Sequence, residues 1–270
     1  MTVTDIATID LGKLTAKDPF ELERLIQAAQ SPGFFYLDFQ NDNATKVVKE
    51  QGPELFTVTD RYFDLPAEVK MKDFRTDQPA SSDRGYKSCE SDETFEMSYD
   101  EMQQGKLRLP TPLSEKESVF NEFHSHCHLA AKTLLTRLAE ALSLPLQEYH
   151  REGEPTETGL KLIAEPSLDK ASDVQENKHT DSGTFTMLFY NEWSLHIQLP
   201  GGGNWTFVPP PSPGVALVHV ANSLQRMTQS QLHSPLHRVT QPADGAAKRY
   251  FLSYFLRPEA DWASREIAGY

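Results

Sequence analysis

The chain has only two cysteines, Cys89 and Cys127, in 270 residues. They do not have the spacing of a metal-binding motif, and two thiols cannot supply the disulfide framework of a small secreted protein. Neither thiol stands in a sequence context that marks a nucleophile. The scarcity of cysteine therefore favours a reducing compartment and argues against a disulfide-rich scaffold.

Positive charge and long hydrophobic runs are also scarce. The 26 Lys and Arg residues face 39 Asp and Glu residues, which gives a net charge of -13 and a pI near 5.1. Nucleic acids and anionic membranes attract basic surfaces, so neither is an expected partner. No stretch approaches the roughly 18 apolar residues that cross a bilayer, and MTVTDIATIDLGKL lacks the pattern of a secretion signal. We expect a cytoplasmic, soluble monomer.

The length and the order of the patterns predict one domain over residues 1–270. Domains rich in β-structure commonly reach this size with a single core. Residues 1–150 are expected to be rich in helices, and residues 151–270 in strands. The prediction is a mainly β fold with flanking helices.

Three helices are predicted in the first part of the chain. Pro19 fits the first turn of a helix over PFELERLIQAAQ. A second helix over residues 44–65 is expected to kink near Pro53, and a third runs over residues 115–142 with an apolar face. The polar segment 72–104 between them predicts an irregular loop near the mouth of a pocket.

Seven short strands are predicted after residue 158. Their sequences are GLKLIAE, TFTMLFYN, LHIQLP, WTFVPP, GVALVHVAN, LHRVTQ and KRYFLSYFLRP, with Gly and Pro between them. Many short strands in succession favour a barrel or a double-sheet jelly roll.

His179, Asp181 and His237 are the most informative residues. His179 and Asp181 stand two apart in a segment that reads as a strand, so their side chains share a face. A second strand supplies His237. Two imidazoles and one carboxylate form the facial triad that suits non-haem Fe(II) and leaves positions open for oxygen and substrate. A single His-x-Asp occurs by chance in many proteins, so the triad depends on the rest of the pattern.

Arg249 is the second informative residue, because it stands inside the otherwise apolar strand KRYFLSYFLRP. A buried cation needs an anionic partner. The guanidinium group matches a carboxylate in a bidentate manner, and the distal carboxylate of 2-oxoglutarate is such a partner.

With these residues in place, the chain resembles the iron- and 2-oxoglutarate-dependent dioxygenase superfamily, in its isopenicillin N synthase-like branch. The resemblance covers nearly the whole chain, through IDLGKL, the Gly-Phe-Phe at Gly33, RGYKSCESDETFEMS, and the segment from WTFVPPPSPG to LHSPLHRV. It implies a double-stranded β-helix (jelly roll) core, with His179, Asp181 and His237 as iron ligands and Arg249 as the cosubstrate anchor. It also implies Fe(II), 2-oxoglutarate and O2 as cofactors.

The same resemblance implies oxidation of a C–H bond of a small molecule, by hydroxylation, desaturation or ring formation, in small-molecule biosynthesis (secondary metabolism). Two departures from the family pattern bear on the cosubstrate. The serine two positions after the arginine is replaced by Phe251, and the tyrosine before Pro166 by Glu165, which either accepts a hydrogen bond from a substrate amine or faces solvent. These departures motivate one alternative, a 2-oxoglutarate-independent iron oxidase of the same fold. A second alternative, of a different class, is a non-catalytic small-molecule binding protein that has kept the barrel.

Four residues are candidates for the substrate pocket. Lys161 and Ile163 alternate on the strand before the metal motif, and Phe95 and Phe255 resemble positions that line the family's cavity. Each is also a plausible core residue. The positive charge of Lys161 or Arg84 is expected to attract a substrate that carries a carboxylate.

Overall fold

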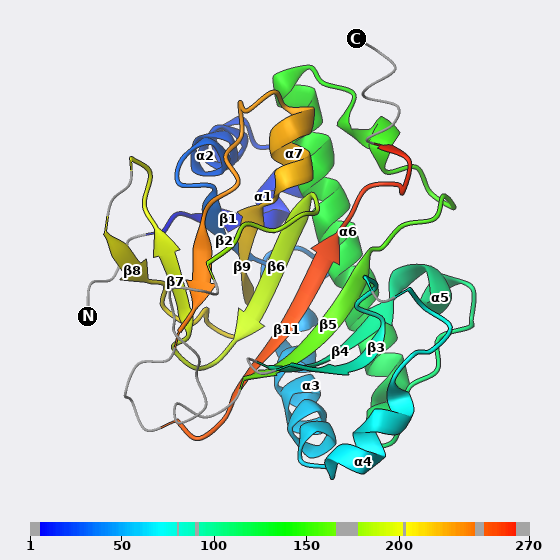
Figure 1. Cartoon of the computed structure of the whole chain (residues 1–270). Helices are drawn as coiled ribbons and strands as arrows, with labels where there is room; N and C mark the ends of the chain where they lie inside the picture. Colours follow the sequence, from blue (N-terminus) through cyan, green and yellow to red (C-terminus); the bar gives the residue numbers. More distant parts are fainter. Residues whose placement is uncertain are drawn as a thin grey trace.

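A computed structural model describes residues 6–79, 81–89, 92–165, 178–201, 204–240 and 246–262. Figure 1 shows strands in the centre with helices around them. The strands are β1 (Thr8–Asp10), β2 (Phe34–Asp38), β3 (Gly85–Ser88), β4 (Glu93–Ser98), β5 (Gly159–Glu165), β6 (Phe185–Tyr190), β7 (Leu195–Gln198), β8 (Trp205–Phe207), β9 (Val215–Val220), β10 (His237–Val239) and β11 (Arg249–Leu256). The helices are α1 (Leu11–Thr15), α2 (Pro19–Gln30), α3 (Val48–Phe63), α4 (Ala67–Lys70), α5 (Tyr99–Gln103), α6 (Glu117–Leu142) and α7 (Asn222–Met227).

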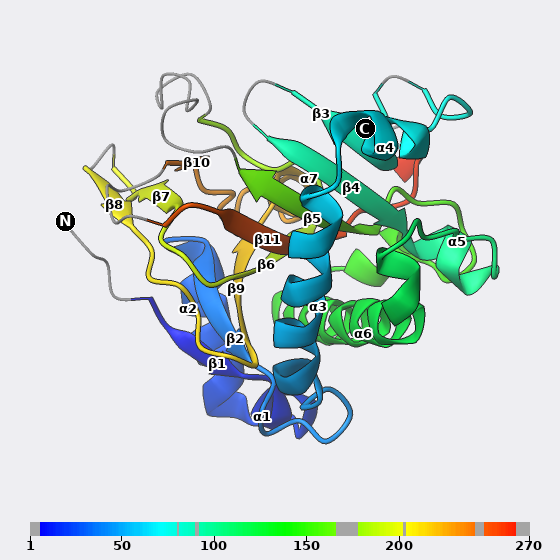
Figure 2. The ribbon, with the colours of Figure 1, turned by 90° about the horizontal axis from the view of Figure 1, so that it is seen from below.

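The strands form a large and a small sheet. The large sheet has eight strands in the order β1-β2-β9-β6-β11-β5-β4-β3, and the small sheet has the order β10-β7-β8. Figure 2 shows α3 and α6 along one face of the large sheet and the small sheet on the opposite side. This arrangement agrees with the predicted jelly roll with flanking helices.

Two hydrophobic clusters correspond to these two faces. The larger cluster joins one face of the large sheet, including Phe189 and Leu252, to Phe123 and Leu134 of α6. The smaller cluster lies between the sheets and includes Phe34, Leu188, Tyr190 and Phe251. Because side chains alternate along a strand, each strand of the large sheet contributes to both faces.

Local signals explain the helices that cover the sheet. The Asp18 side chain accepts hydrogen bonds from the backbone N–H groups of Phe20 and Glu21, and Pro19 occupies the first turn of α2. In α6, apolar residues recur at helical spacing and bury one face of the helix. α3 continues through Pro53 as one helix. No helix in the described ranges is long and apolar enough to cross a bilayer.

The prediction for the segment 72–104 was wrong. It contains β3 and β4, which extend the large sheet beyond β5, and the short helix α5. Tyr86 pairs with Phe95, and both side chains are buried. In β4 the polar residues Glu96 and Ser98 alternate with the apolar residues Phe95 and Met97, so the segment reads as polar although it forms a strand. The seven strands predicted after residue 158 are present as β5 to β11.

Candidate iron and cosubstrate site

His179 and His237 are joined by their backbones. The N–H of His179 donates to the carbonyl of His237 at 2.9 Å, and the N–H of His237 donates to the carbonyl of His179 at 3.0 Å. This isolated antiparallel bridge links the segment before β6 to the start of β10. It brings the two imidazole rings to 4.4 Å between centroids.

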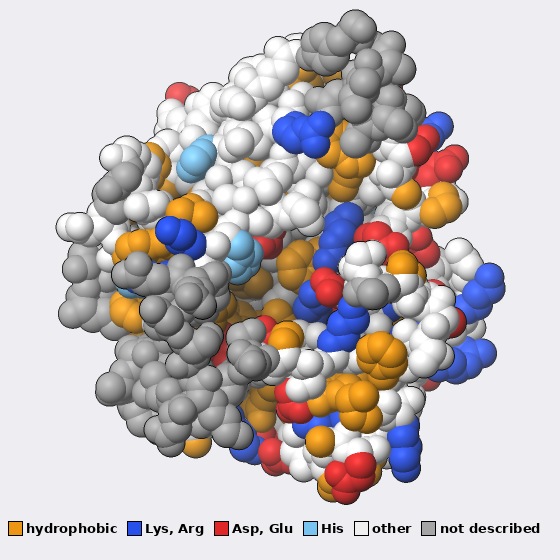
Figure 3. All heavy atoms as spheres, in the orientation of Figure 1, with side chains coloured by type: hydrophobic (Ala, Val, Ile, Leu, Met, Phe, Trp, Pro, Cys, Tyr) orange, Lys and Arg blue, Asp and Glu red, His pale blue; other side chains and the backbone are white. Residues whose placement is uncertain are grey.

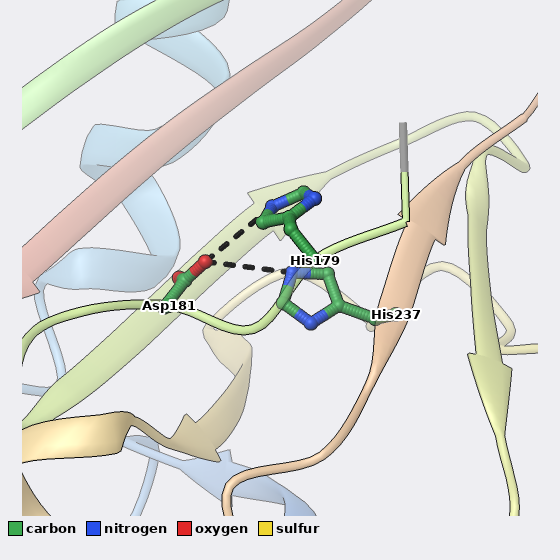
Figure 4. Close-up of side chains that lie close together, drawn as sticks. All are labelled: His179, Asp181 and His237. Carbon is green, nitrogen blue, oxygen red and sulfur yellow. Dashed lines mark ion pairs between the residues drawn. The ribbon is translucent and has the colours of Figure 1, made fainter. Parts of the chain in front are cut away.

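The Asp181 carboxylate faces both rings, as Figure 4 shows. Its Oδ1 lies 3.5 Å from Nε2 of His179 and 3.5 Å from Nε2 of His237. One ligand atom from each of the three residues lies within 4.8 Å of the others. Among the described residues this is the one group of three or more metal-binding side chains that lies so close together.

The start of α7 holds the loop that carries Asp181. The backbone N–H of Asn222 donates to the Asp181 carbonyl at 2.7 Å, and its side-chain amide donates to the Thr180 hydroxyl at 2.9 Å. The Ser223 hydroxyl donates to the Ser182 carbonyl at 2.6 Å. These contacts fix the loop without using the carboxylate itself.

The chemistry of His237 suits a metal ligand. Its Nδ1 lies 3.2 Å from the carbonyl of Pro235, so an Nδ1–H donates there and the Nε2 lone pair points toward Asp181. Burial lowers the pKa of the His237 imidazole to about 3, which keeps the ring neutral. A neutral imidazole with its second nitrogen hydrogen-bonded is the usual form of a histidine ligand.

The second oxygen of Asp181 has its own partners. The Thr186 hydroxyl of β6 donates a hydrogen bond to Oδ2, and Nε2 of His219 lies 3.5 Å from the same oxygen. Burial alone would raise the pKa of the Asp181 carboxyl, but His219, His179, His237 and the Thr186 hydroxyl together hold it well below its usual range. Asp181 is therefore an anion with Oδ1 directed at the two candidate imidazole ligands.

The donor set fits Fe(II). Two imidazoles and one carboxylate on one side of an ion form the facial triad of non-haem iron sites. Two ligands at right angles, each about 2.1 Å from a metal, are about 3.0 Å apart. The two separations between Asp181 and the imidazoles are 3.5 Å, and all three ligand atoms lie within 4.8 Å of one another, so the side chains would move closer together around an ion.

A glycine next to the site permits close packing behind the rings. Gly33 has φ +86°, and a methyl group added there would lie 2.2 Å from the backbone oxygen of His233. The next residue, Phe34, packs against His219 at 5.1 Å and His237 at 6.0 Å between ring centroids. The Gly-Phe pair therefore supports the imidazoles from behind with an apolar surface.

Arg249 is buried at the start of β11, with an exposed fraction of 2%. Its Nε donates to the carbonyl of Trp193 at 3.0 Å, and its Nη1 donates to the carbonyl of Ala246 at 3.1 Å. These two contacts orient the guanidinium group. Arg249 shares a face of β11 with Phe251 and Phe255, because the three residues are separated by even numbers.

Phe251 and Glu165 replace the family's polar residues in different ways. The Phe251 ring is buried between the sheets and lies 5.2 Å from the Tyr190 ring. Glu165 pairs with Arg249 in the register of β5 and β11, and its Oε1 is shielded from solvent. Of the two alternatives for Glu165, exposure to solvent does not hold for this oxygen.

The strand register shows which candidate pocket residues lie on the face of the triad. Thr186, which contacts Asp181, pairs with Phe255 across β6 and β11. Two residues further along β11, on the same face of the sheet, Ser253 pairs with Lys161 of β5. Ile163 lies one row further and pairs with Phe251. Lys161, Ile163 and Phe255 thus share the triad's face of the sheet. Figure 3 shows this side of the molecule as a hollow with hydrophobic side chains at its base.

Phe95 does not belong to this face, and its proposed pocket role is corrected. It pairs with Leu162 rather than with Lys161, and its ring packs against Tyr62 of α3 at 5.4 Å. Since neighbouring residues point to opposite faces, Phe95 is part of the core beneath the helices.

Four residues near the site were missed by the sequence interpretation. His219 on β9, Thr186 and Ser253 have their positions fixed by the strand register, and Arg257 follows β11. A single histidine in the apolar run VALVHV was the available signal for His219, since a buried polar side chain in a strand requires a partner. The other three had no distinct signal in the sequence.

A separate cavity of about 350 Å³ lies between α5, α6 and the segment before β5. Its lining includes His128, Lys132, His150 and Arg257, and none of the three candidate iron ligands. The His128 ring stacks on Tyr99 at 3.9 Å and therefore packs as a core aromatic residue does.

Comparison with known proteins agrees with this geometry. The model of the 2OG-Fe(II) oxygenase superfamily matches residues 151–258, and the model of the N-terminal region of non-haem dioxygenases in morphine synthesis matches residues 6–126. A 2-oxoglutarate-dependent dioxygenase of Glarea lozoyensis (gloE) is 32% identical, over 98% of this chain and 83% of its own length. Another from Gibberella zeae is 31% identical, over 94% of this chain and 79% of its own length.

Solved structures share the fold. The dioxygenase for auxin oxidation 1 from Arabidopsis thaliana, in a binary complex with 2-oxoglutarate, superposes with a TM-score of 0.76 at 19% identity, over 95% of this chain and 94% of that one. A Neurospora crassa protein in complex with alpha-KG and thymine gives a TM-score of 0.75 at 20% identity, over 94% of this chain and 86% of that one. The predicted jelly-roll fold is confirmed, and the chain belongs to the 2OG-Fe(II) oxygenase superfamily.

Proposed function

We propose that His179, Asp181 and His237 bind Fe(II) and that Arg249 binds the distal carboxylate of 2-oxoglutarate, in an enzyme that oxidises a C–H bond of a small molecule. The observation that carries the proposal is the approach of Asp181 Oδ1 to both imidazole Nε2 atoms at 3.5 Å. When bound, Fe(II), 2-oxoglutarate and O2 together supply the oxidant, and 2-oxoglutarate leaves as succinate and carbon dioxide.

The residues of the chain have three tasks in this function. Asp181, His179 and His237 would hold the metal through one carboxylate and two imidazoles, a donor set that leaves room for cosubstrate and oxygen. Thr186 and His219 orient the Asp181 carboxylate through its other oxygen. Phe34 and the apolar residues between the sheets exclude water from the rear of the site.

The names of the relatives support the assignment of the cosubstrate, and small-molecule biosynthesis is the role that we infer. We also infer a single catalytic domain, because β1 to β4 of the first half complete the sheet that carries β5, β6, β9 and β11. A cytoplasmic monomer remains our proposal from composition.

A 2-oxoglutarate-independent iron oxidase is the second candidate, because Phe251 occupies the position of the family's serine. One experiment separates the two. The Fe(II)-loaded protein is titrated with 2-oxoglutarate without oxygen, and the visible metal-to-ligand charge-transfer band is recorded for wild type and for Arg249→Ala. We expect a band in wild type that requires much more 2-oxoglutarate in the variant.

Lys248→Ala is the matched control, because Lys248 precedes Arg249 but its side chain pairs with Asp60 and Asp64 at the surface. A wild-type protein that binds iron and gives no band would contradict the use of 2-oxoglutarate and favour the oxidase. If wild type and Arg249→Ala need the same concentration of 2-oxoglutarate, the role of Arg249 is contradicted, but the use of 2-oxoglutarate is not. A protein that binds neither iron nor 2-oxoglutarate would match a non-catalytic binding protein.

A further inference from the structure

A group of three cations borders the triad's face of the large sheet at β5. Lys161 Nζ lies 5.3 Å from the centroid of the Phe255 ring, and the Arg257 guanidinium carbon lies 4.6 Å from the same centroid. Arg84 Nη1 approaches Glu96 Oε1 at 3.8 Å. We call Arg84, Lys161 and Arg257 the basic corner. Figure 3 shows Lys, Arg and acidic side chains beside the hollow.

The basic corner surrounds one buried carboxylate. Glu96 Oε1 lies 2.7 Å from Arg257 Nη1, and Oε2 lies 3.3 Å from Lys161 Nζ. The side chain of Glu96 is 1% exposed, and those of Arg84, Lys161 and Arg257 are 5%, 12% and 16% exposed. Gly159 makes room for this packing, since a methyl group there would lie 2.7 Å from Glu96 Oε1 and 2.9 Å from Arg84 Nη1.

Three largely buried cations are therefore matched by one buried anion. The remaining acidic partners are Asp83, which is 45% exposed, and Glu157, which is 61% exposed. Buried cations require anionic partners, because desolvation of a charge is costly. The buried side chains of the basic corner and Glu96 thus carry a net positive charge. The exposed carboxylates of Asp83 and Glu157 balance it.

Asp83 occupies the position that an acidic ligand would take. Its Oδ2 lies 2.6 Å from Lys161 Nζ and 4.0 Å from Arg257 Nη2. Because its side chain is nearly half exposed, it can turn to solvent when another carboxylate arrives. The exchange leaves Lys161 paired throughout, because the ligand carboxylate replaces that of Asp83 beside the largely buried ammonium group.

The basic corner and the candidate iron site are close enough for one small ligand. Phe255 pairs with Thr186, whose hydroxyl bonds Asp181, and Lys161 lies one row away on β5. Adjacent strands are about 4.8 Å apart, so β5 is about 10 Å from β6. A small organic acid matches this distance.

Ser253 provides an independent indication of a ligand between the two sites. It is fully buried and pairs with Lys161 on one side and Leu188 on the other. Its hydroxyl has no hydrogen-bond partner among the described residues. Buried polar groups normally have partners, so an unpaired hydroxyl in this row suggests that a bound molecule supplies one.

We propose that the substrate is a small carboxylic acid whose carboxylate displaces Asp83 from Lys161 and Arg257, while its carbon skeleton lies over Phe255 toward the iron site. This inference rests on the proposed function for the position of the reaction. The recognition of the carboxylate itself requires only the basic corner.

The test uses matched acids and amides as probes. Phenylacetate, 3-phenylpropionate, indole-3-acetate and N-acetyl-leucine are each compared with the corresponding primary amide by saturation-transfer NMR, with the full chain and saturating 2-oxoglutarate. We expect at least one acid to bind about 10-fold or more tightly than its amide, as a charge-assisted hydrogen bond allows. Addition of Mn(II) should broaden the signals of that acid, because it lies near the candidate metal site.

Two variants are expected to change acid binding in opposite directions. Lys161→Met keeps the aliphatic stem over Phe255 and should abolish the preference for the acid. Asp83→Asn removes the competing carboxylate and should tighten acid binding by about 3-fold or more. Lys248→Met is the matched control, because Lys248 is an exposed residue directly before β11, and it should leave acid binding unchanged.

The inference is overturned if no acid binds better than its amide, or if Lys161→Met keeps the preference while its thermal melting is that of a folded protein. It is also overturned if Asp83→Asn leaves acid binding unchanged or weakens it. Failure of the iron and cosubstrate proposal has a different signature. Wild type would then prefer acids over amides, but Mn(II) would not broaden their signals.

Discussion

The backbones of His179 and His237 bond each other in both directions, at 2.9 and 3.0 Å. A pair of reciprocal hydrogen bonds fixes the distance between two segments that are far apart in the chain. The imidazoles therefore face Asp181 before a metal binds. Such preorganisation reduces the cost of ordering the ligands at the moment of binding.

Asp181→Asn should abolish stoichiometric Fe(II) binding and leave the fold intact. The amide is neutral and removes the anionic ligand, whereas the backbone bridge and the α7 contacts do not involve the carboxylate. Anaerobic equilibrium dialysis with an iron assay measures binding, and circular dichroism monitors the fold. Asp77→Asn, at an exposed surface pair with Arg75, is the control. Iron binding at wild-type strength would exclude Asp181 as a ligand.

Thr186→Val should weaken Fe(II) binding by about 10- to 100-fold, the usual effect of losing a group that orients a metal ligand. Valine keeps the shape of the side chain but cannot donate to Asp181 Oδ2. Thr186→Ser keeps the hydroxyl and should bind nearly as wild type does. The same dialysis measurement applies, and equal affinities of the valine and serine variants would show that the hydrogen bond has no effect on the metal.

Much of the fold could be predicted from the sequence because its signals are local. The strands β5 to β11 are bounded by glycine and proline, and α2 begins at Pro19 with Asp18 as its cap. These features depend on residues near one another in the chain. The spacing of His179 and Asp181 suggested two ligands, but the selection of His237 with them depended on the resemblance to the family over the rest of the chain.

The pocket could not be predicted to the same extent, because it depends on register. Phe95 resembled a cavity residue, but its pairing with Leu162 turns it toward α3. A shift of one residue in register moves a side chain to the other face, and a single sequence does not specify the register of distant strands. For the same reason the cluster of Glu96 with Arg257, and the contact of His219 with Asp181, were visible only in the structure.

Phe251→Ser should lower the free energy of unfolding by about 3–5 kcal/mol, although it restores the residue that the family usually has. The Phe251 ring is buried against Tyr190, so its removal leaves a cavity between the sheets. Phe255→Ser is the control on the same strand and should cost less, because that ring is only partly buried. Urea denaturation measures both. A small effect at Phe251 would mean that the serine position is not part of the core.

His150→Gln should reduce the pH dependence of stability between about pH 4 and pH 6.5. His150 is buried, with Nδ1 3.0 Å from the Leu146 carbonyl and Nε2 2.7 Å from the Thr184 hydroxyl. Burial lowers its pKa from 6.5 to about 4. The unfolded chain therefore takes up a proton first as the pH falls, and stability is lost between pH 6.5 and pH 4.

One proton corresponds to about 1.4 kcal/mol per pH unit. Urea denaturation at pH 7, 5.5 and 4.5 should show a slope that is smaller by up to this amount in His150→Gln. His126→Gln is the comparison: burial also lowers the pKa of this half-buried imidazole of α6, so the variant should reduce the slope in the same direction but by less than His150→Gln. Identical slopes for wild type and His150→Gln would mean that His150 is protonated in the folded protein over this range.

Ser253→Ala should stabilise the ligand-free protein and weaken ligand binding. The buried Ser253 hydroxyl lacks a partner among the described residues, and an unsatisfied buried group costs about 1–3 kcal/mol. Alanine removes that cost without creating a large cavity. Ser223→Ala is the control of opposite sign, because the Ser223 hydroxyl donates to the Ser182 carbonyl and its loss should destabilise the fold. Urea denaturation measures both variants, and a Ser253→Ala protein less stable than wild type would show that the hydroxyl is satisfied without a ligand. A rise in stability together with weaker binding of the acid probes would mean that the ligand pairs with the Ser253 hydroxyl. The ligand-free fold would then keep this unpaired hydroxyl, at a cost in stability, for the sake of binding.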